Sequence, residues 1–413
     1  MRARVSQSAS PVEGAKLIRS TRPTRSPLCL SFVVLATLAS AVATCAQTDS
    51  KAQKPYAAIN HEAINYAGPG REAAHDLPGP EIRIGLLAPL QGARKAEGEA
   101  LRQAAQIALE DEAANPLRGG RRLALVARDE TGLWGRASSE IVRLVFDDRV
   151  VALITSSEGS AAHLAEQVGN RVGVPVLTLA SDSTTTQINI PWLFRVVPND
   201  TVQAAAFAED IYRKRAFQKV LLITERTHDG RVGREEFEKA ARRLQAPPPE
   251  SLDVALPLAD VDSLLAEIRR RVPQAVVLWT SAETAARLIG QVESTPTIYV
   301  CRKALEEPFT QVAKRRQGQG IWFVTSGTGS PTATSEGFRA RFRARVGTAP
   351  SLAAAEVYDA VRLVAAGLRQ SGPNRARLRD RLASFGEYRG VSGLISFDGA
   401  GNNREAVVLA PLN

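Results

Sequence analysis

Ile82-Arg83-Ile84-Gly85-Leu86-Leu87 is a short, mostly apolar run of the kind that forms a strand, and a helical pattern comes after it. From Leu101 to Ala114 the apolar residues recur at helical spacing, and residues 122–127 form a second short apolar run. Short strands that alternate with helices of about ten or more residues are typical of a parallel sheet with helices on both faces. The sequence therefore predicts an α/β, doubly wound fold.

The same alternation then runs through the body twice. In the first half we expect helices at 138–146 and 161–172 and strands at 150–154 and 174–179. In the second half we expect helices at 202–212, 233–244, 261–271 and 283–292, and strands at 219–224, 253–256, 275–279, 297–300 and 320–324. Two successive units of similar size predict two doubly wound parallel-sheet lobes. Because ligands bind beyond the carboxyl ends of parallel strands, the expected ligand site is a cleft between the lobes.

Composition excludes several classes of function. The chain has 413 residues, 44% hydrophobic and 23% charged, which is an ordinary globular balance. The net charge of +10 includes no long basic run with interleaved aromatic residues, which argues against nucleic-acid binding. Cys29, Cys45 and Cys301 give no disulfide framework and no Cys/His metal spacing. His61, His75, His163 and His228 form no metal spacing and no catalytic triad, so we expect no enzyme, metal or cofactor.

The N-terminal part has the pattern of an export signal. Residues 28–43 are apolar, follow a basic segment and end in Ala41-Val42-Ala43, a small-residue cleavage site. An uncleaved membrane anchor and a lipoprotein signal acylated at Cys45 are the alternatives. We assign residues 1–46 to a signal peptide and residues 47–80, with their Gly-Pro turns, to a flexible spacer. The expected location is the periplasm or the extracytoplasmic face.

Several segments of the body resemble, in order, the leucine/isoleucine/valine-binding branch of the type I periplasmic solute-binding proteins. Residues 82–92 resemble the first strand and loop of that family, and residues 194–200, Phe-Arg-Val-Val-Pro-Asn-Asp, resemble the crossover into the second lobe. The other similar segments are 150–154 with its Ser-rich turn, 173–177, 358–361 and 390–398. The resemblance spans residues 81–413.

The resemblance implies two lobes joined by a three-segment hinge. Lobe 1 would comprise residues 81–198 plus 331–371, and lobe 2 residues 199–330 plus 372–413, with crossings near Pro198, Ser326 to Pro331 and Ser371 to Pro373. Ligand contacts with both lobes would favour the closed form, which an ABC import permease would then recognise. We expect a monomer that binds a small-molecule ligand. The alternative is a ligand-sensing or accessory protein on the same fold, which signals to a partner instead of a permease.

Two loops of the first lobe are expected to hold the ligand. The turn 155–160 follows a strand and opens a helix, where hydroxyls and free N–H groups suit an anion such as a carboxylate. The resemblance implies that a Ser of this turn binds the ligand carboxylate, and both Ser157 and Ser160 fit; a plain helix N-cap is the alternative. From the next loop, the resemblance implies ligand contacts by Ala180, Ser181 and Asp182.

The remaining candidates include departures from the family pattern. Glu97 and Val232 stand where amino-acid binders often carry aromatic residues, and Arg302 stands with Lys303 near an expected acidic position. Because a cation would repel a ligand ammonium, these bases favour a carboxylate-bearing solute without a free α-amino group; alternatively Glu306 or Glu307 takes the acidic role. Ser281 completes the expected ligand set together with Tyr358, which borders the cleft or lies in the core.

Overall fold

The computed structural model describes residues 76–132, 134–187, 191–291, 296–315, 320–326 and 333–412. The expected signal peptide and all but the last residues of the expected spacer lie outside these ranges. Within the described ranges, no helix has the length and apolar character needed to cross a membrane.

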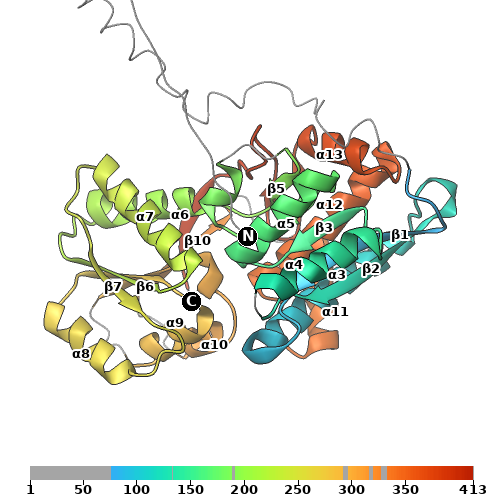
Figure 1. Cartoon of the computed structure of the whole chain (residues 1–413). Helices are drawn as coiled ribbons and strands as arrows, with labels where there is room; N and C mark the ends of the chain where they lie inside the picture. The colour runs from blue at the N-terminus through green and yellow to red at the C-terminus, as the bar shows by residue number, and fades with distance from the viewer. Residues whose placement is uncertain are drawn as a thin grey trace, which may run out of the picture. The chain divides into compact units, whose positions relative to one another are not determined.

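The first lobe is built on a five-stranded parallel sheet in the order β2-β1-β3-β4-β5 (Figure 1). The apolar run 82–87 lies in β1, an inner strand that pairs with both β2 and β3, and Ile84 lies opposite Leu125 and Ala152. The strands are β1 (Glu81–Ala88), β2 (Arg122–Asp129), β3 (Ala152–Thr155), β4 (Val176–Thr178) and β5 (Leu193–Arg195).

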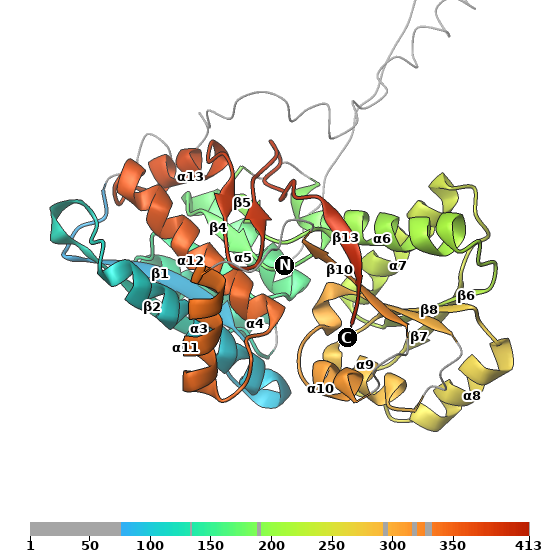
Figure 2. The ribbon, with the colours of Figure 1, turned by 180° about the vertical axis from the view of Figure 1, so that it is seen from behind.

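Helices cover both faces of this sheet. On one face, α4 (Trp134–Phe146) and α5 (Gly159–Val172) pack against strand side chains such as Leu153. On the other face lie α3 (Lys95–Ala113), α11 (Ala333–Val346), α12 (Leu352–Ser371) and α13 (Arg375–Ala383), whose apolar side chains share one core with Ile84 and Leu86. Figure 2 shows α11, α12 and α13 from behind.

The second lobe contains a six-stranded sheet in the order β13-β10-β9-β8-β6-β7, parallel except for β13. The strands are β6 (Val220–Glu225), β7 (Glu250–Val254), β8 (Ala275–Trp279), β9 (Thr297–Val300), β10 (Ile321–Ser326) and β13 (Val407–Pro411). The helices packed on it are α6 (Asp200–Ala208), continued by the π-helical turn η4 (Glu209–Lys214), α7 (His228–Arg243), α8 (Val261–Arg271), α9 (Ala282–Ile289) and α10 (Phe309–Lys314). The predicted α/β class with two doubly wound lobes is confirmed.

The end of the chain departs from the predicted lobe boundary. We expected residues 372–413 in the second lobe, but Leu378 and Leu382 of α13 and Ile395 of β12 (Leu394–Ile395) are buried in the core of the first lobe. The reason is local: Gly372 ends α12 with φ 71°, which turns the chain back so that α13 packs on α12. The third crossing between the lobes therefore lies between Asn403 and β13, and the expected crossing at 371–373 is wrong.

The strand ends set up the site. Because the strands of each sheet are parallel, the loops after β3 and β4 lie at one edge of the first sheet, and the loops after β6, β8 and β9 at one edge of the second. Several of these loops end in a helix cap: Thr227 accepts a hydrogen bond from Gly230 N at the start of α7, and Ser281 from Thr284 N at the start of α9.

Candidate functional site

The carboxyl-end loops of both sheets meet in a cleft that the protein's own side chains nearly fill. The cavity at its centre has a volume of only about 20 Å³. A neighbouring hollow of about 10 Å³ lies beside Asp200, Thr227 and Asp229. The residues around the central cavity are Ser157, Leu179, Ser181, Arg302, Lys303, Glu306, Leu352, Ala353 and Glu356. The structure is therefore a closed form, in which contacts between side chains of the two lobes replace solute contacts.

Lys303 makes the central contact between the lobes. It follows β9 in the 3-10 turn η5 (Arg302–Ala304), and its Nζ lies 2.8 Å from Glu158 Oε1 and 2.5 Å from Asp229 Oδ2. Burial alone would lower the pKa of Lys303, but the charges of Asp229 and Glu158 raise that pKa above its usual value. Burial likewise opposes ionisation of Glu158, yet Lys303 and Arg94 lower its pKa to about 2. Both groups are therefore charged at neutral pH.

Arg94 extends the ion network on the first-lobe side. It lies in the 3-10 turn η1 (Gly92–Arg94), and its guanidinium donates to Glu97 over 2.6 and 2.8 Å and to Glu158 over 2.5 Å. Glu130 lies 3.7 Å away and accepts a hydrogen bond of 2.7 Å from Ser156 Oγ. Burial raises the pKa of Glu130 to about 8, although Arg94 opposes this shift. Glu97 thus belongs to this ion network.

The N-terminus of α5 already holds a carboxylate. Gly159 N donates to Asp229 Oδ2 over 3.4 Å, so an acid of the second lobe lies where we expected a ligand anion. The structure also separates the two candidate serines. Ser157 lines the cleft, whereas Ser160 lines a different hollow of about 310 Å³ on the first lobe, beside Arg94 and Glu130.

The three candidate residues in the loop after β4 have different contacts. The Ala180 carbonyl accepts a hydrogen bond of 3.0 Å from Arg195 Nε, and Ser181 lines the cleft while its carbonyl accepts a hydrogen bond of 2.7 Å from Asp200 N. Asp182 caps the 3-10 turn η3 (Ser183–Thr186), and its Oδ2 lies 2.7 Å from His228 Nε2 and 3.1 Å from His163 Nε2. Hydrogen bonds from His163 and Thr184 hold the pKa of Asp182 below its usual value despite burial.

Arg302 lines the cleft, but its charge is neutralised. Its guanidinium pairs with Glu356 of α12, just as the neighbouring Lys303 pairs with Glu158 and Asp229. Because both bases are paired with carboxylates, they no longer give a reason to expect repulsion of a ligand ammonium. Glu306 also lines the cleft, and burial followed by the charge of Glu97 raises its pKa to about 7. Glu307, the other acidic candidate, is exposed.

Three predicted site residues have structural roles away from the cleft. Val232 is buried in α7, and Ser281 caps α9 while its Oγ donates to Glu225 Oε1 over 2.6 Å. Tyr358 lies in the first-lobe core, 1% exposed, with its ring 4.4 Å from that of Phe338. Its hydroxyl donates to Asp111 Oδ2 over 2.7 Å. Among the described residues, none of the three lines the cleft cavities, and their assignment as ligand contacts stays a prediction.

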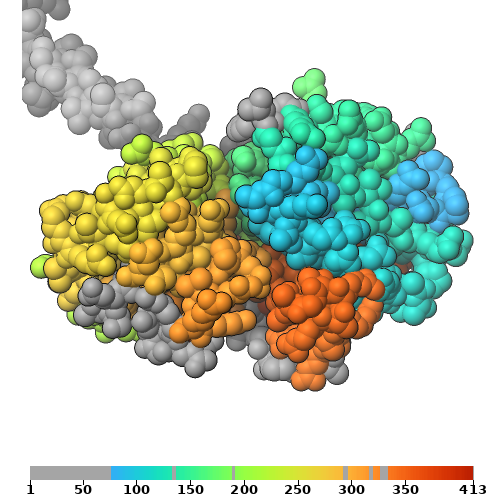
Figure 3. Space-filling model, turned by 90° about the horizontal axis from the view of Figure 1, so that it is seen from below, coloured from blue at the N-terminus to red at the C-terminus, as the bar shows by residue number. Residues whose placement is uncertain are grey.

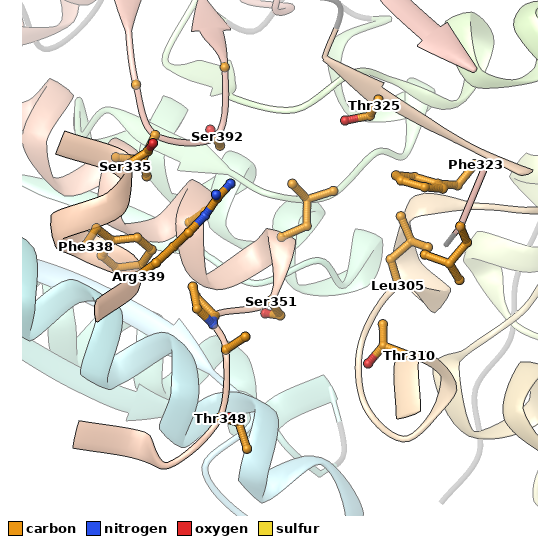
Figure 4. A pocket seen from close by; sticks show the side chains of 18 of the residues that line it. Leu305, Thr310, Phe323, Thr325, Ser335, Phe338, Arg339, Thr348, Ser351 and Ser392 are labelled. Carbon is orange, nitrogen blue, oxygen red and sulfur yellow. The ribbon is translucent and has the colours of Figure 1, made fainter. Parts of the chain in front are cut away.

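A second and larger cavity, of about 900 Å³, lies between α10 and α11. Figure 4 shows Ser335, Phe338 and Arg339 of α11 on one side, Leu305, Thr310 and Phe323 on the other, and the Arg339 side chain directed into the space. In Figure 3 the segments around residues 300–315 and 333–346 lie on either side of this region. None of the ten predicted site residues is among the described residues that line this cavity. Leu352 lines both this cavity and the central cleft.

Sequence reasoning missed Arg94, Glu130, Glu158 and Asp229. Asp229 carried a usable signal, because it follows the strand expected at 219–224 and therefore had to lie at the carboxyl edge of the second sheet. Glu158 lay inside the turn that we had singled out for its hydroxyls. The sequence around Asp229 and Glu158 does not indicate that Lys303 would be the partner of both.

Comparison with known proteins agrees with this architecture. The chain resembles the branched-chain amino acid transporter substrate-binding protein LivJ from Streptococcus pneumoniae in complex with isoleucine, at 23% identity over 81% of this chain and 96% of that one, with a TM-score of 0.71. It also resembles a leucine-binding protein, LivK, from Thermotoga maritima (20% identity, 80% and 95% covered, TM-score 0.68). A third similar structure is an ABC transporter solute-binding protein from R. palustris in complex with benzoate (20% identity, 81% and 93% covered, TM-score 0.70).

No curated protein matches the chain. The sequence model of the family described as periplasmic binding protein matches residues 81–409, which includes both sheets and all three crossings. The resemblance inferred from the sequence is thereby confirmed, and this chain belongs to the periplasmic binding protein family.

Proposed function

We propose that this chain is an extracytoplasmic receptor that closes its two lobes on a small carboxylate-bearing solute and delivers it to an ABC import permease. The observation that carries the proposal is the position of the Asp229 carboxylate, which reaches across from the second lobe to Gly159 N of the first and also contacts Lys303 Nζ of its own lobe. A cleft that holds a carboxylate there offers the same donors to a solute carboxylate once the lobes open.

Displacement of Asp229 gives a physical account of binding. In the open form, the α5 N-terminus with Ser157 on the first lobe loses Asp229, and Lys303 on the second lobe loses Glu158 but keeps Asp229. A solute carboxylate that takes the place of Asp229 meets donors from both lobes and so favours closure. Each charge-assisted hydrogen bond contributes about 1.5–3 kcal/mol, so two or three of them suffice for selective binding. The isoleucine and benzoate of the similar structures both carry a carboxylate.

The rest of the solute would lie toward Ser181 and Glu306. Both line the central cavity together with Ser157. An ionised Glu306 would pair with a solute ammonium, and a protonated Glu306 would donate to an amide or a second carboxylate. The proposed solute class is therefore an amino acid or a simple organic acid, with or without an amide group, and it includes the α-amino acids that sequence reasoning disfavoured.

The near absence of space in the closed cleft favours a second candidate function. A cavity of about 20 Å³ holds no solute of this size, and the ion pairs of Lys303 and Arg302 close the lobes without one. A protein that closes unaided could present its closed surface to a signalling partner instead of a permease. In that case the closed form would persist in solution without solute.

The proposal includes export. Residues 1–46 would act as a signal peptide, with Cys45 as the point of lipid attachment if the signal is of the lipoprotein type, and the mature protein would be a monomer. N-terminal sequencing and mass measurement of the protein from the cell envelope test this part. An intact Met1 on cytoplasmic protein would contradict it.

The solute part is tested by a thermal-shift screen followed by calorimetry, because a solute that binds the folded state raises the melting temperature. The screen covers branched-chain amino acids, benzoate, dicarboxylates and amides. Ser157→Ala should weaken binding of the best carboxylate by about tenfold, the value of one such hydrogen bond. Ser160→Ala on the same turn is the matched control and should leave it unchanged. Equal effects of the two substitutions, or no stabilisation by any carboxylate, would overturn the proposal.

A further inference from the structure

A cluster of two histidines and one aspartate joins the lobes beside the solute cleft. His163 comes from α5 and Asp182 from the loop after β4, both in the first lobe, whereas His228 opens α7 in the second. Helices α5 and α7 face each other across the cleft (Figure 1). His163 Nε2 and His228 Nε2 lie 3.1 and 2.7 Å from the same oxygen, Asp182 Oδ2. We call these three residues the His–Asp–His cluster.

The three donor atoms have the chemistry and spacing of a zinc site. They lie within 4.8 Å of one another. In a tetrahedral zinc site with bonds of about 2.0–2.1 Å, neighbouring ligand atoms are about 3.4 Å apart, so small side-chain rotations suffice. Imidazole nitrogens with one carboxylate oxygen suit Zn²⁺ and other late divalent ions, whereas Mg²⁺ and Ca²⁺ prefer oxygen ligands alone. His163 and His228 retain side-chain exposures of 25% and 35%, which gives an ion a path to the site.

Neighbouring groups hold these ligands in the way that metal sites require. His163 Nδ1 lies 3.4 Å from Oε2 of Glu166, whose side chain is 2% exposed and whose Oε2 has no hydrogen-bond partner among the described residues. A carboxylate beside the far nitrogen favours the tautomer with its proton on Nδ1, in which Nε2, now 2.8 Å from Thr184 Oγ1, would turn to the ion. The other Asp182 oxygen, Oδ1, accepts hydrogen bonds from Thr184 N and Oγ1 over 2.8 and 2.7 Å. The Asp182 carboxylate is therefore held with Oδ2 directed at the histidines.

A further polar atom lies beside the cluster. Asp229 Oδ1 is buried and has no hydrogen-bond partner among the described residues. A Cβ on Gly159 would lie 2.4 Å from this atom and 2.8 Å from Asp182 Oδ2, so both oxygens lie beside the same glycine. Asp229 Oδ1 is thus in position to accept a hydrogen bond from a water in the fourth coordination position.

We propose that the His–Asp–His cluster binds one Zn²⁺ ion through His163 Nε2, Asp182 Oδ2 and His228 Nε2, and that this ion ties the two lobes together. This goes beyond solute binding, since none of the three ligands lines the central cavity. Because one ligand belongs to the second lobe, the complete site exists only in the closed form. Zinc therefore favours closure, and by linkage anything else that favours closure binds with zinc cooperatively.

The experiment is calorimetric titration of the full chain with ZnCl₂, after removal of any affinity tag and treatment with a chelator. We expect one ion per chain, and no binding of Mg²⁺ at the same concentrations. His163→Ala and His228→Ala should each weaken binding by at least about 100-fold, and Glu166→Gln by about 10- to 100-fold. The double substitution His61→Ala/His75→Ala, outside the described residues, is the control and should leave the affinity unchanged.

A second measurement separates a shared site from a site on one lobe. Zn²⁺ should reduce the radius of gyration of the wild-type protein measured by small-angle X-ray scattering, and it should not do so in His228→Ala. Melting temperatures of the variants without metal show that they fold. Absence of zinc binding would overturn the proposal, and so would binding that survives His228→Ala or that is lost in His61→Ala/His75→Ala. Solute binding by the metal-free protein is measured separately, so the two proposals stand or fall independently.

Discussion

Lys303 Nζ of the second lobe lies 2.8 Å from Glu158 Oε1 of the first, at the N-terminal cap of α5. The next residue back, Arg302, pairs with Glu356 of the first lobe as well. Two consecutive bases therefore reach across the cleft to two different elements. Both ion pairs exist only when the lobes are closed, so each contributes to the free-energy difference between the open and closed forms.

Lys303→Met should shift the protein toward the open form. The substitution leaves Glu158 and Asp229 without their shared cation. Removing one member of a largely buried ion pair costs about 3 kcal/mol. Small-angle X-ray scattering should report a larger radius of gyration than for the wild type in the absence of solute. Lys219→Met, at an exposed lysine of the same lobe, is the control and should leave the radius unchanged. A closed Lys303→Met protein would show that Lys303 does not hold the lobes together.

Asp229→Asn should raise the affinity for carboxylate solutes. The wild-type Asp229 carboxylate contacts both Gly159 N and Lys303 Nζ, and a solute carboxylate must displace it. A neutral amide competes less strongly for these donors, so we expect calorimetry to show binding tighter by about tenfold, equivalent to about 1.4 kcal/mol. Asp262→Asn, in the first turn of α8, is the control for loss of a charge. Weaker binding by Asp229→Asn would mean that Asp229 contacts the solute instead of competing with it.

Binding of an α-amino acid should strengthen as the pH rises through 7. Burial raises the pKa of Glu306 to about 7, so the carboxyl is mostly protonated at pH 6 and ionised at pH 8. Only the ionised form attracts a solute ammonium, and binding that requires a deprotonated group weakens by up to tenfold per pH unit below its pKa. We expect calorimetry to show about tenfold tighter binding at pH 8 than at pH 6.

Two comparisons identify the group responsible for this pH dependence. Glu306→Gln should remove the difference between pH 6 and pH 8, whereas Glu307→Gln, at the exposed neighbour, should retain it. A solute with a carboxylate and no amino group should show no gain at pH 8. The same gain in Glu306→Gln would assign the titration to another group of the cleft.

The parts of the fold that depend on periodicity could be predicted from the sequence. Strands of four or more residues between helices stand out because both of their faces are apolar, over the whole length of β8 and from Ile84 onward in β1. The three-residue strand β5 was assigned to the crossover because residues 194–200 resemble that segment of the family. The placement of α13 depends on how the chain turns at Gly372. The sequence of α13 itself does not indicate the direction of that turn, so it could not predict which lobe α13 packs on.

The site was harder to predict than the fold because its geometry depends on pairs that are far apart in the sequence. The loops were found, since strand ends at one edge of a sheet follow from topology. The partners were not: Arg302 and Lys303 were read as free cations, although Glu356 and Glu158 neutralise them from the other lobe. Tyr358 was ambiguous because an aromatic residue on an apolar helix fits a core as well as a cleft, and packing against Phe338 decides it.

Arg195 illustrates a residue whose role only the fold reveals, and it gives the last prediction. Its side chain is 0% exposed. The guanidinium donates to the Ala180 carbonyl over 3.0 Å, to the Asp182 carbonyl, to Thr185 Oγ1 and to Asn402 Oδ1. One buried cation thus fastens the loop after β4, which carries Ser181, to the segment that leads into the third crossing between the lobes.

Arg195→Met should lower the free energy of unfolding by at least about 3 kcal/mol, because several buried acceptors lose their donor and each costs about 1–3 kcal/mol. Arg195→Lys keeps the charge but cannot reproduce the planar set of donors, so we expect an intermediate loss. Arg83→Met, at an arginine whose side chain is 45% exposed, should change stability by less than about 0.5 kcal/mol. Urea unfolding of the three variants measures these differences. A loss below about 1 kcal/mol in Arg195→Met would show that water or neighbouring groups replace the guanidinium, and that the loop does not depend on it.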